Sequence, residues 1–199
     1  MIKIMNHKCT QKIHPVQRLI AGIVPGDYDT ELFGIAETRK MFGICNGSTI
    51  PFNKVNPHLL SLLANALMAD TRAMEHLGHM DPEEALEEYA FHLYGSADGT
   101  ADFTADGKLG LVENTNCSHD CYCWTWNSKR ILINDNVLTR REVQVSQLMA
   151  TDLADKQIAT LLGISQNTLV SHKRNMYGKA GVMSRAGYVA KSFIQNVLR

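Results

Sequence analysis

The 199-residue sequence has no uninterrupted apolar run of the ~20 residues that a transmembrane helix needs. Its opening stretch, Met1–Lys8, lacks the apolar core of a secretory signal peptide, so we expect a cytoplasmic protein. Cysteine is scarce, and the five cysteines are an odd number. That number argues against a disulfide framework and agrees with a reducing compartment.

Motifs of several enzyme classes are also missing. The sequence contains no Gly-x-Ser-x-Gly, no phosphate-binding glycine loop, no His-Glu-x-x-His and no dinucleotide-binding glycine pattern. The N-terminal part lacks the alternation of apolar strands and helices that a phosphorylatable receiver requires, and an autoinducer-binding α/β/α domain fits it poorly. We therefore expect no enzyme activity, and the input signal cannot be read from these residues.

The net charge of zero hides a strong asymmetry along the chain. From Leu138 onward there are nine basic and three acidic residues, a net charge of +6. The preceding residues hold 11 basic and 17 acidic groups, a net charge of −6. The basic end is therefore the part suited to a polyanion such as nucleic acid, with binding that weakens as salt rises.

Residues 138–197 carry the start and stop signals of four helices. Thr139 and Glu142 stand in the spacing of a capping box, which predicts a helix beginning at Thr139. The four expected caps are Thr139, Asp155, Ser165 and Ser184. Gly163 and Gly181 stand where helix C-termini favour left-handed residues. The second and third helices, joined by a tight glycine turn, have the order of a helix-turn-helix.

The third expected helix, over residues 165–179, has two distinct sides. Helical spacing places Leu169, His172, Met176 and Ala180 toward the core and Val170, Ser171, Arg174 and Gly178 outward. Arginine can donate two hydrogen bonds to guanine, serine is permissive, and valine can touch a thymine methyl, which makes the outward side suitable for reading bases. Phosphate contacts are expected from Lys156, Asn167, Thr168, Lys173, Asn175 and Lys179.

The C-terminal third resembles the LuxR/GerE-type DNA-binding domain over about sixty residues. The resemblance is carried by Leu138–Val143, Lys156–Ala159, Leu162–Ser165, Thr168–Leu169, Ser171–His172, Asn175–Tyr177, Lys179, Gly181–Val182 and Ser184–Ala186. It implies a four-helix domain whose third helix enters the major groove and whose fourth helix usually mediates dimerisation. Val170 replaces the family's usual lysine, and Asp152 replaces its usual glycine before the second helix.

These features predict a sequence-specific transcriptional regulator that binds double-stranded DNA as a homodimer through the helix over 184–198. The alternative is a protein-interaction module, an anti-activator or anchor, that keeps the helix-turn-helix fold without specific DNA binding. Val170 in place of lysine motivates that alternative. Selection from random DNA separates the two hypotheses, since an interaction protein would enrich no sequence.

The N-terminal part, residues 1–134, is expected to be an acidic, mostly helical domain, which makes the whole chain mainly α. Expected helices cover 16–23, 30–42, 56–78 and 81–95, with a β-hairpin around Asp106-Gly107, a strand over 130–134 and a linker at 134–136. The DNA-binding domain then covers residues 138–199.

A dense group of metal-binding residue types lies at 117–123. Cys117, His119, Cys121 and Cys123 are enough donors for a tetrahedral zinc ion, although the spacing is not that of a zinc knuckle. Cys9, Cys45, His7 or His14 could complete the shell from a distance. Three hypotheses stay open: reduced cysteines packed with Trp124 and Trp126, a structural zinc site, and redox sensing or an iron–sulfur cluster.

Overall fold

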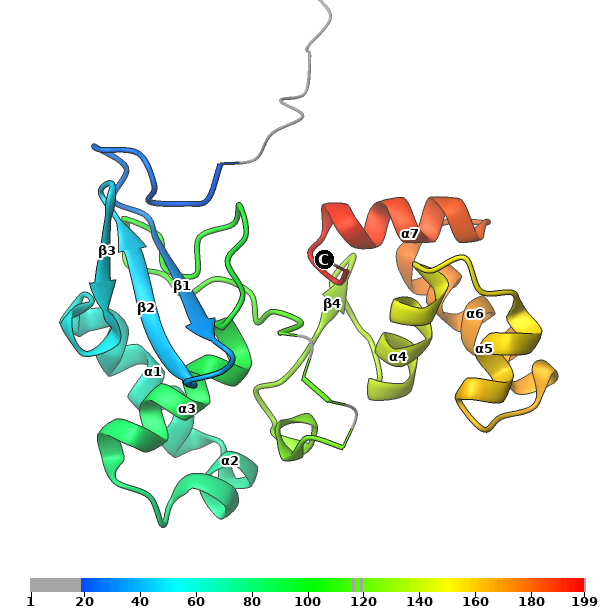
Figure 1. Ribbon diagram of the computed structural model, residues 1–199, viewed down its shortest axis with the longest axis horizontal. Helices are drawn as coiled ribbons and strands as arrows, with labels where there is room; N and C mark the ends of the chain where they lie inside the picture. The colour runs from blue at the N-terminus through cyan, green and yellow to red at the C-terminus, as the bar shows by residue number, and fades with distance from the viewer. Residues whose placement is uncertain (1–18, 116, 119, 199) are drawn as a thin grey trace, which may run out of the picture.

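The computed structural model describes residues 19–115, 117–118 and 120–198. This part of the chain is mainly helical, as predicted, with a small antiparallel sheet near its N-terminal end. In Figure 1 the sheet and helices α1–α3 lie on one side, and helices α4–α7 lie on the other. No described helix is both long and apolar enough to cross a membrane.

The sheet comprises β1 (Thr30–Ile35), β2 (Lys40–Cys45) and β3 (Ser48–Pro51), paired antiparallel in that order. The predicted helix over 30–42 is therefore wrong. Asn46 and Gly47 join β2 to β3 with φ values of 50° and 74°, the geometry of a two-residue hairpin turn. Asn-Gly is the strongest short-range hairpin signal, and it stands in the sequence just beyond the misassigned stretch.

Three helices follow the sheet, and the last of them packs directly against β1 and β2 while the other two pack against it. They are α1 (Pro57–Ala69), α2 (Thr71–Leu77) and α3 (Pro82–Tyr94). One long helix was predicted over 56–78, but the chain breaks at Asp70, whose side chain accepts hydrogen bonds from Arg72 N and Ala73 N and so caps α2. The third helix follows the prediction, with Asp81 as its cap and Gly95 at its end.

The predicted helix over 16–23 is absent from its described part, where Ile20–Ile23 form a single turn, and residues 16–18 lie outside the described chain. The expected hairpin at Asp106-Gly107 keeps its turn but forms no extended strands. Phe103 pairs with Leu109 through an isolated bridge and with Thr30 through another. A short 3-10 helix, η1 (Phe52–Lys54), precedes α1, and a second, η2 (Tyr122–Thr125), lies within the cysteine-rich segment.

The segment predicted as a linker, 134–136, is a hairpin turn. It joins β4 (Leu132–Ile133) to β5 (Asn136–Val137), and both Asn134 and Asp135 have positive φ. Ile131 and Ile133 are buried with the C-terminal helices, so this hairpin shares their core. The turn is also tied to the helices, because Asn134 Nδ2 donates to Ala180 O at 2.8 Å.

The C-terminal helices are α4 (Arg140–Met149), α5 (Asp155–Leu161), α6 (Gln166–Ala180) and α7 (Arg185–Ile194). The Thr139 capping box and the Ser165 and Ser184 caps form as predicted. Asp155 does not cap α5: it is the first helical residue, and the Gln157 side chain instead accepts from Ala154 N at 2.9 Å. Both Gly163 and Gly181 adopt the expected left-handed conformation.

The two sides of the molecule touch near the end of α7. Asn114 Nδ2 donates to Val197 O at 2.8 Å, and Asn196 Nδ2 donates to Thr100 Oγ1 at 2.9 Å. Asn114 and Val197 are buried, so these contacts fix the C-terminal residues against the loop that follows α3.

Candidate functional site

The turn between α5 and α6 sets how α6 is presented. Gly163, with φ of 63°, reverses the chain, and Ser165 Oγ accepts from Thr168 N at 3.0 Å to start the next helix. On the inner side of α6, Leu169 and Met176 are completely buried. Close packing of these side chains in the apolar core therefore fixes the rotation of α6 about its own axis.

The opposite side of α6 is open. Val170 is 58% exposed, and Ser171 and Arg174 are also exposed with every described residue of the chain in place. A Cβ atom added at Gly178 would meet nothing within 4 Å, so this side is also slim. The two-sided helix predicted from residue spacing forms, with Leu169, Met176 and Ala180 buried and His172 half-buried, and the described residues of the acidic N-terminal part do not cover its outer face.

Lysine environments around α6 differ. Lys156 is exposed, as are Asn167, Thr168 and Asn175. Lys173 Nζ lies 2.7 Å from Asp155 Oδ2, and Lys179 Nζ lies 2.6 Å from Glu142 Oε2. These two ion pairs connect α6 to α5 and to α4, so both lysines also hold the helix in place.

Helix α7 exposes an apolar stripe next to this unit. Tyr188 is buried, and its hydroxyl lies 2.6 Å from Ser146 Oγ on α4. On the other side, Phe193 is 45% and Ile194 62% exposed, and Ala186 and Ala190 are exposed at helical spacing from them. The stripe is thus available for contact with another surface.

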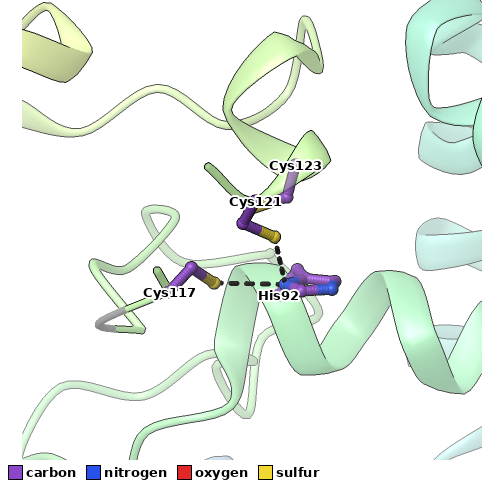
Figure 2. A group of neighbouring side chains, drawn as sticks. All are labelled: His92, Cys117, Cys121 and Cys123. Carbon is purple, nitrogen blue, oxygen red and sulfur yellow. Dashed lines mark hydrogen bonds between the residues drawn. The ribbon is translucent and has the colours of Figure 1, made fainter. Parts of the chain in front are cut away.

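The cysteine-rich segment converges on a histidine from α3. His92 Nδ1 lies 3.1 Å from Cys117 Sγ and 3.8 Å from Cys121 Sγ, as Figure 2 shows. With Cys123 included, the four donor atoms all lie within 4.8 Å of one another. We call these four residues the Cys3His cluster.

Of the residues expected at this cluster, Cys117, Cys121 and Cys123 come together as predicted. His119, Cys9, His7 and His14 lie outside the described residues, and Cys45 is on β2. Sequence reasoning missed His92, which stands 25 residues before Cys117. The sequence offered one weak signal for His92. This histidine directly precedes Leu93, which had been assigned to the inner face of the helix predicted over 81–95.

The cluster perturbs its own thiols. The hydrogen bond with Cys123 lowers the pKa of Cys117 to about 3, and His92 and Lys129 act in the same direction against the effect of burial. The same hydrogen bond, together with burial, raises the pKa of Cys123. The shared hydrogen bond therefore favours the thiolate form at Cys117 and the thiol form at Cys123.

A comparison with protein families now gives the C-terminal unit a name. Residues 136–191 match the family model described as bacterial regulatory proteins, luxR family. The match spans β5, α4, α5, the turn, α6 and most of α7. These residues form a LuxR-family helix-turn-helix domain. The resemblance inferred from the sequence is thus confirmed for this part of the chain.

Curated relatives of the LuxR-family domain include named regulators. The chain is 45% identical over 49 residues to a putative HTH-type transcriptional regulator of Aeromonas salmonicida, covering 25% of each chain. It is 46% identical over 50 residues to the nitrate/nitrite response regulator protein NarP of Escherichia coli, covering 25% of this chain and 23% of NarP.

A longer match is to the Fimbriae Z protein of Escherichia coli, 42% identical over 82 residues, which is 41% of this chain and 34% of that protein. The chain therefore spans only a quarter to a third of the length of these relatives. No solved structure matches the chain significantly.

Proposed function

We propose that this chain is a sequence-specific DNA-binding transcriptional regulator that places α6 in the major groove. The observation that carries the proposal is the open side of α6: an exposed, narrow surface that includes the exposed Arg174 guanidinium, on a helix whose rotation is fixed by its buried side. A groove about 12 Å wide accepts a helix of that width. LuxR-family membership of residues 136–191 and the named regulators among the relatives support the same function.

Base reading is assigned to Val170, Ser171 and Arg174. They stand at positions i, i+1 and i+4 of α6, so they share one side of the helix. Arg174 can pair with guanine O6 and N7, Ser171 can donate or accept, and Val170 can contact a thymine methyl.

Phosphate contacts are assigned to residues bordering that side: Lys156, Asn167, Thr168, Lys173, Asn175 and Lys179. Lys156 is exposed, and no ion pair among the described residues offsets its charge. The charges of Lys173 and Lys179 are partly offset by Asp155 and Glu142, so each contributes less to phosphate binding than Lys156 does.

The exposed stripe of α7 is assigned to contact with a second copy of the chain. Phe193 and Ile194 would lose their exposed surface in a two-fold contact, and burial of such side chains favours association. A two-fold dimer presents two copies of α6, so the DNA site consists of two half-sites in inverted order, about one helical turn apart.

The test is a selection from random double-stranded DNA with the purified full-length protein, followed by sequencing of the retained pool. The proposal expects one enriched motif with inverted half-sites, and a steep fall of affinity as salt is raised. A pool that stays random while the protein remains folded would contradict specific recognition.

A further inference from the structure

We propose that His92, Cys117, Cys121 and Cys123 bind one zinc ion. The four donor atoms already lie within 4.8 Å of one another, and they are the thiolate and imidazole types that zinc favours. Zinc–sulfur bonds of about 2.3 Å and zinc–nitrogen bonds of about 2.1 Å separate tetrahedral ligand atoms by roughly 3.5–3.8 Å. The distances from His92 Nδ1 are 3.1 Å to Cys117 Sγ, slightly below that range, and 3.8 Å to Cys121 Sγ, at its upper end.

The imidazole of His92 is oriented as a metal ligand requires. Its Nδ1 atom faces the sulfur atoms, as Figure 2 shows, while Nε2 lies 3.1 Å from Glu88 Oε1 on the same helix. The Glu88 carboxylate is itself held by Tyr122, whose hydroxyl donates to Oε1 at 2.6 Å, and by Arg39. A carboxylate that accepts a hydrogen bond from one ring N–H leaves the other ring nitrogen free to coordinate, and histidine ligands of zinc commonly have such a partner.

A buried positive group lies beside the cluster. Lys129 is only 7% exposed, and its Nζ donates to His92 O, to Glu113 O at 2.9 Å and to Thr115 Oγ1 at 3.0 Å. Those three acceptors match the three donors of an ammonium group. Three thiolates and one zinc ion carry a net charge of −1, which the Lys129 charge offsets in a region shielded from water.

The ligands come from separate parts of the fold. His92 is on α3, Cys117 follows a loop with no regular secondary structure, and Cys123 is in η2. Cys117 and Ser118 also line a groove with Gln144 and Leu148 of α4, in the LuxR-family domain. A closed four-ligand site is typical of structural zinc, so the ion would fasten the loop between α3 and β4 and hold one wall of this groove.

The first test is elemental analysis of full-length protein purified without added metal. We expect about one equivalent of zinc per chain, and little zinc in the C121S and H92A variants. C45S is the matched control, because Cys45 lies on β2 outside the cluster, and it should keep its zinc. Iron instead of zinc, no metal with freely titratable thiols, or full zinc in C121S would overturn the proposal.

A second test begins with cobalt substitution of the wild-type protein, a step that does not depend on the folding of variants. Replacing zinc by cobalt in the wild-type protein should give the strong visible absorption of tetrahedral cobalt and the near-ultraviolet bands of thiolate ligands. The E88Q variant keeps all four ligands but loses the charged partner of His92, so its zinc affinity should fall about 10–100-fold. A cobalt spectrum of octahedral type, or E88Q binding zinc as tightly as wild type, would contradict the assignment.

Discussion

Replacement of Arg174 by alanine separates base reading from general attraction to DNA. Arg174 is exposed on α6, and no other described residue packs over it, so its loss should change the free energy of unfolding by less than about 0.5 kcal/mol. Arg174 stands four positions after Val170, a rise of about 6 Å along the helix. That rise is close to two base-pair steps of about 3.4 Å, so the two side chains should address positions about two base pairs apart.

Loss of a bidentate contact with guanine costs roughly 1–3 kcal/mol, which is about 5–150-fold in affinity for the selected site. Fluorescence anisotropy at one salt concentration should show this loss on the selected duplex and a much smaller loss on random DNA. A duplex already changed at the guanine read by Arg174 should bind the R174A variant and the wild-type protein almost equally. The matched control is K156A, which should weaken binding to both DNAs alike. Equal losses on selected and random DNA for R174A would refute base reading by Arg174.

Three further variants test the electrostatics. D155N removes the carboxylate that pairs with Lys173. DNA affinity should rise, and the slope of log affinity against log salt concentration should steepen by about one released counterion. An unchanged slope would show that Lys173 does not contact a phosphate. Burial raises the pKa of Glu142, but hydrogen bonds from Lys179 and from Thr139 at the helix cap outweigh it and lower this pKa below 4.5. The ionised Glu142 therefore stabilises the fold above pH 4.5, and this stabilisation is lost as the pH falls through the lowered pKa. E142Q should therefore lower Tm at pH 7 and differ little from wild type in strong acid, and a constant difference would contradict the ion pair. Burial and neighbouring carboxylates raise the pKa of Asp102 far above 3.8, so the tendency of this carboxyl to ionise destabilises the fold as pH rises. D102N should therefore raise Tm at pH 7 and give no such increase near pH 3. A lower Tm of D102N at pH 7 would contradict this reasoning.

The C-terminal helices could be predicted closely because their signals are local. Thr139, Ser165 and Ser184 each cap the helix that follows, and the apolar spacing of α6 correctly separated Leu169 from Val170. Such signals need no knowledge of distant residues. The shift of the α5 cap from Asp155 to Ala154 is an error of one residue, within the usual uncertainty of helix ends.

The N-terminal sheet was missed because its strands lack a clean alternation. In β1, Thr30, Glu31 and Leu32 are all buried in succession, since long-range partners cover both faces. Glu31 is buried although its side chain is ionisable, and no periodicity rule would place such a residue in a strand interior. The break at Asp70 was missed for a related reason: its carboxylate also accepts from Ser128, which is 58 residues away.

The Cys3His cluster shows how far local reasoning reaches. Three of its residues were found from their density within seven positions, but the histidine depends on how α3 packs against the loop. His119, the histidine nearest in sequence, was the natural choice before that packing was known. When a site is assembled from two distant segments, the sequence therefore reveals the ligands that lie close together along the chain but not the ligand from the other segment.

Methylation interference on the selected duplex tests the central claim most directly. Methylation of guanine N7 marks the major groove, whereas methylation of adenine N3 marks the minor groove. If α6 lies in the major groove, N7 methylation of one guanine in each half-site should block binding of the wild-type protein, and the R174A variant should no longer sense that methyl group. Interference confined to adenine N3, or none in either groove, would contradict the placement of α6.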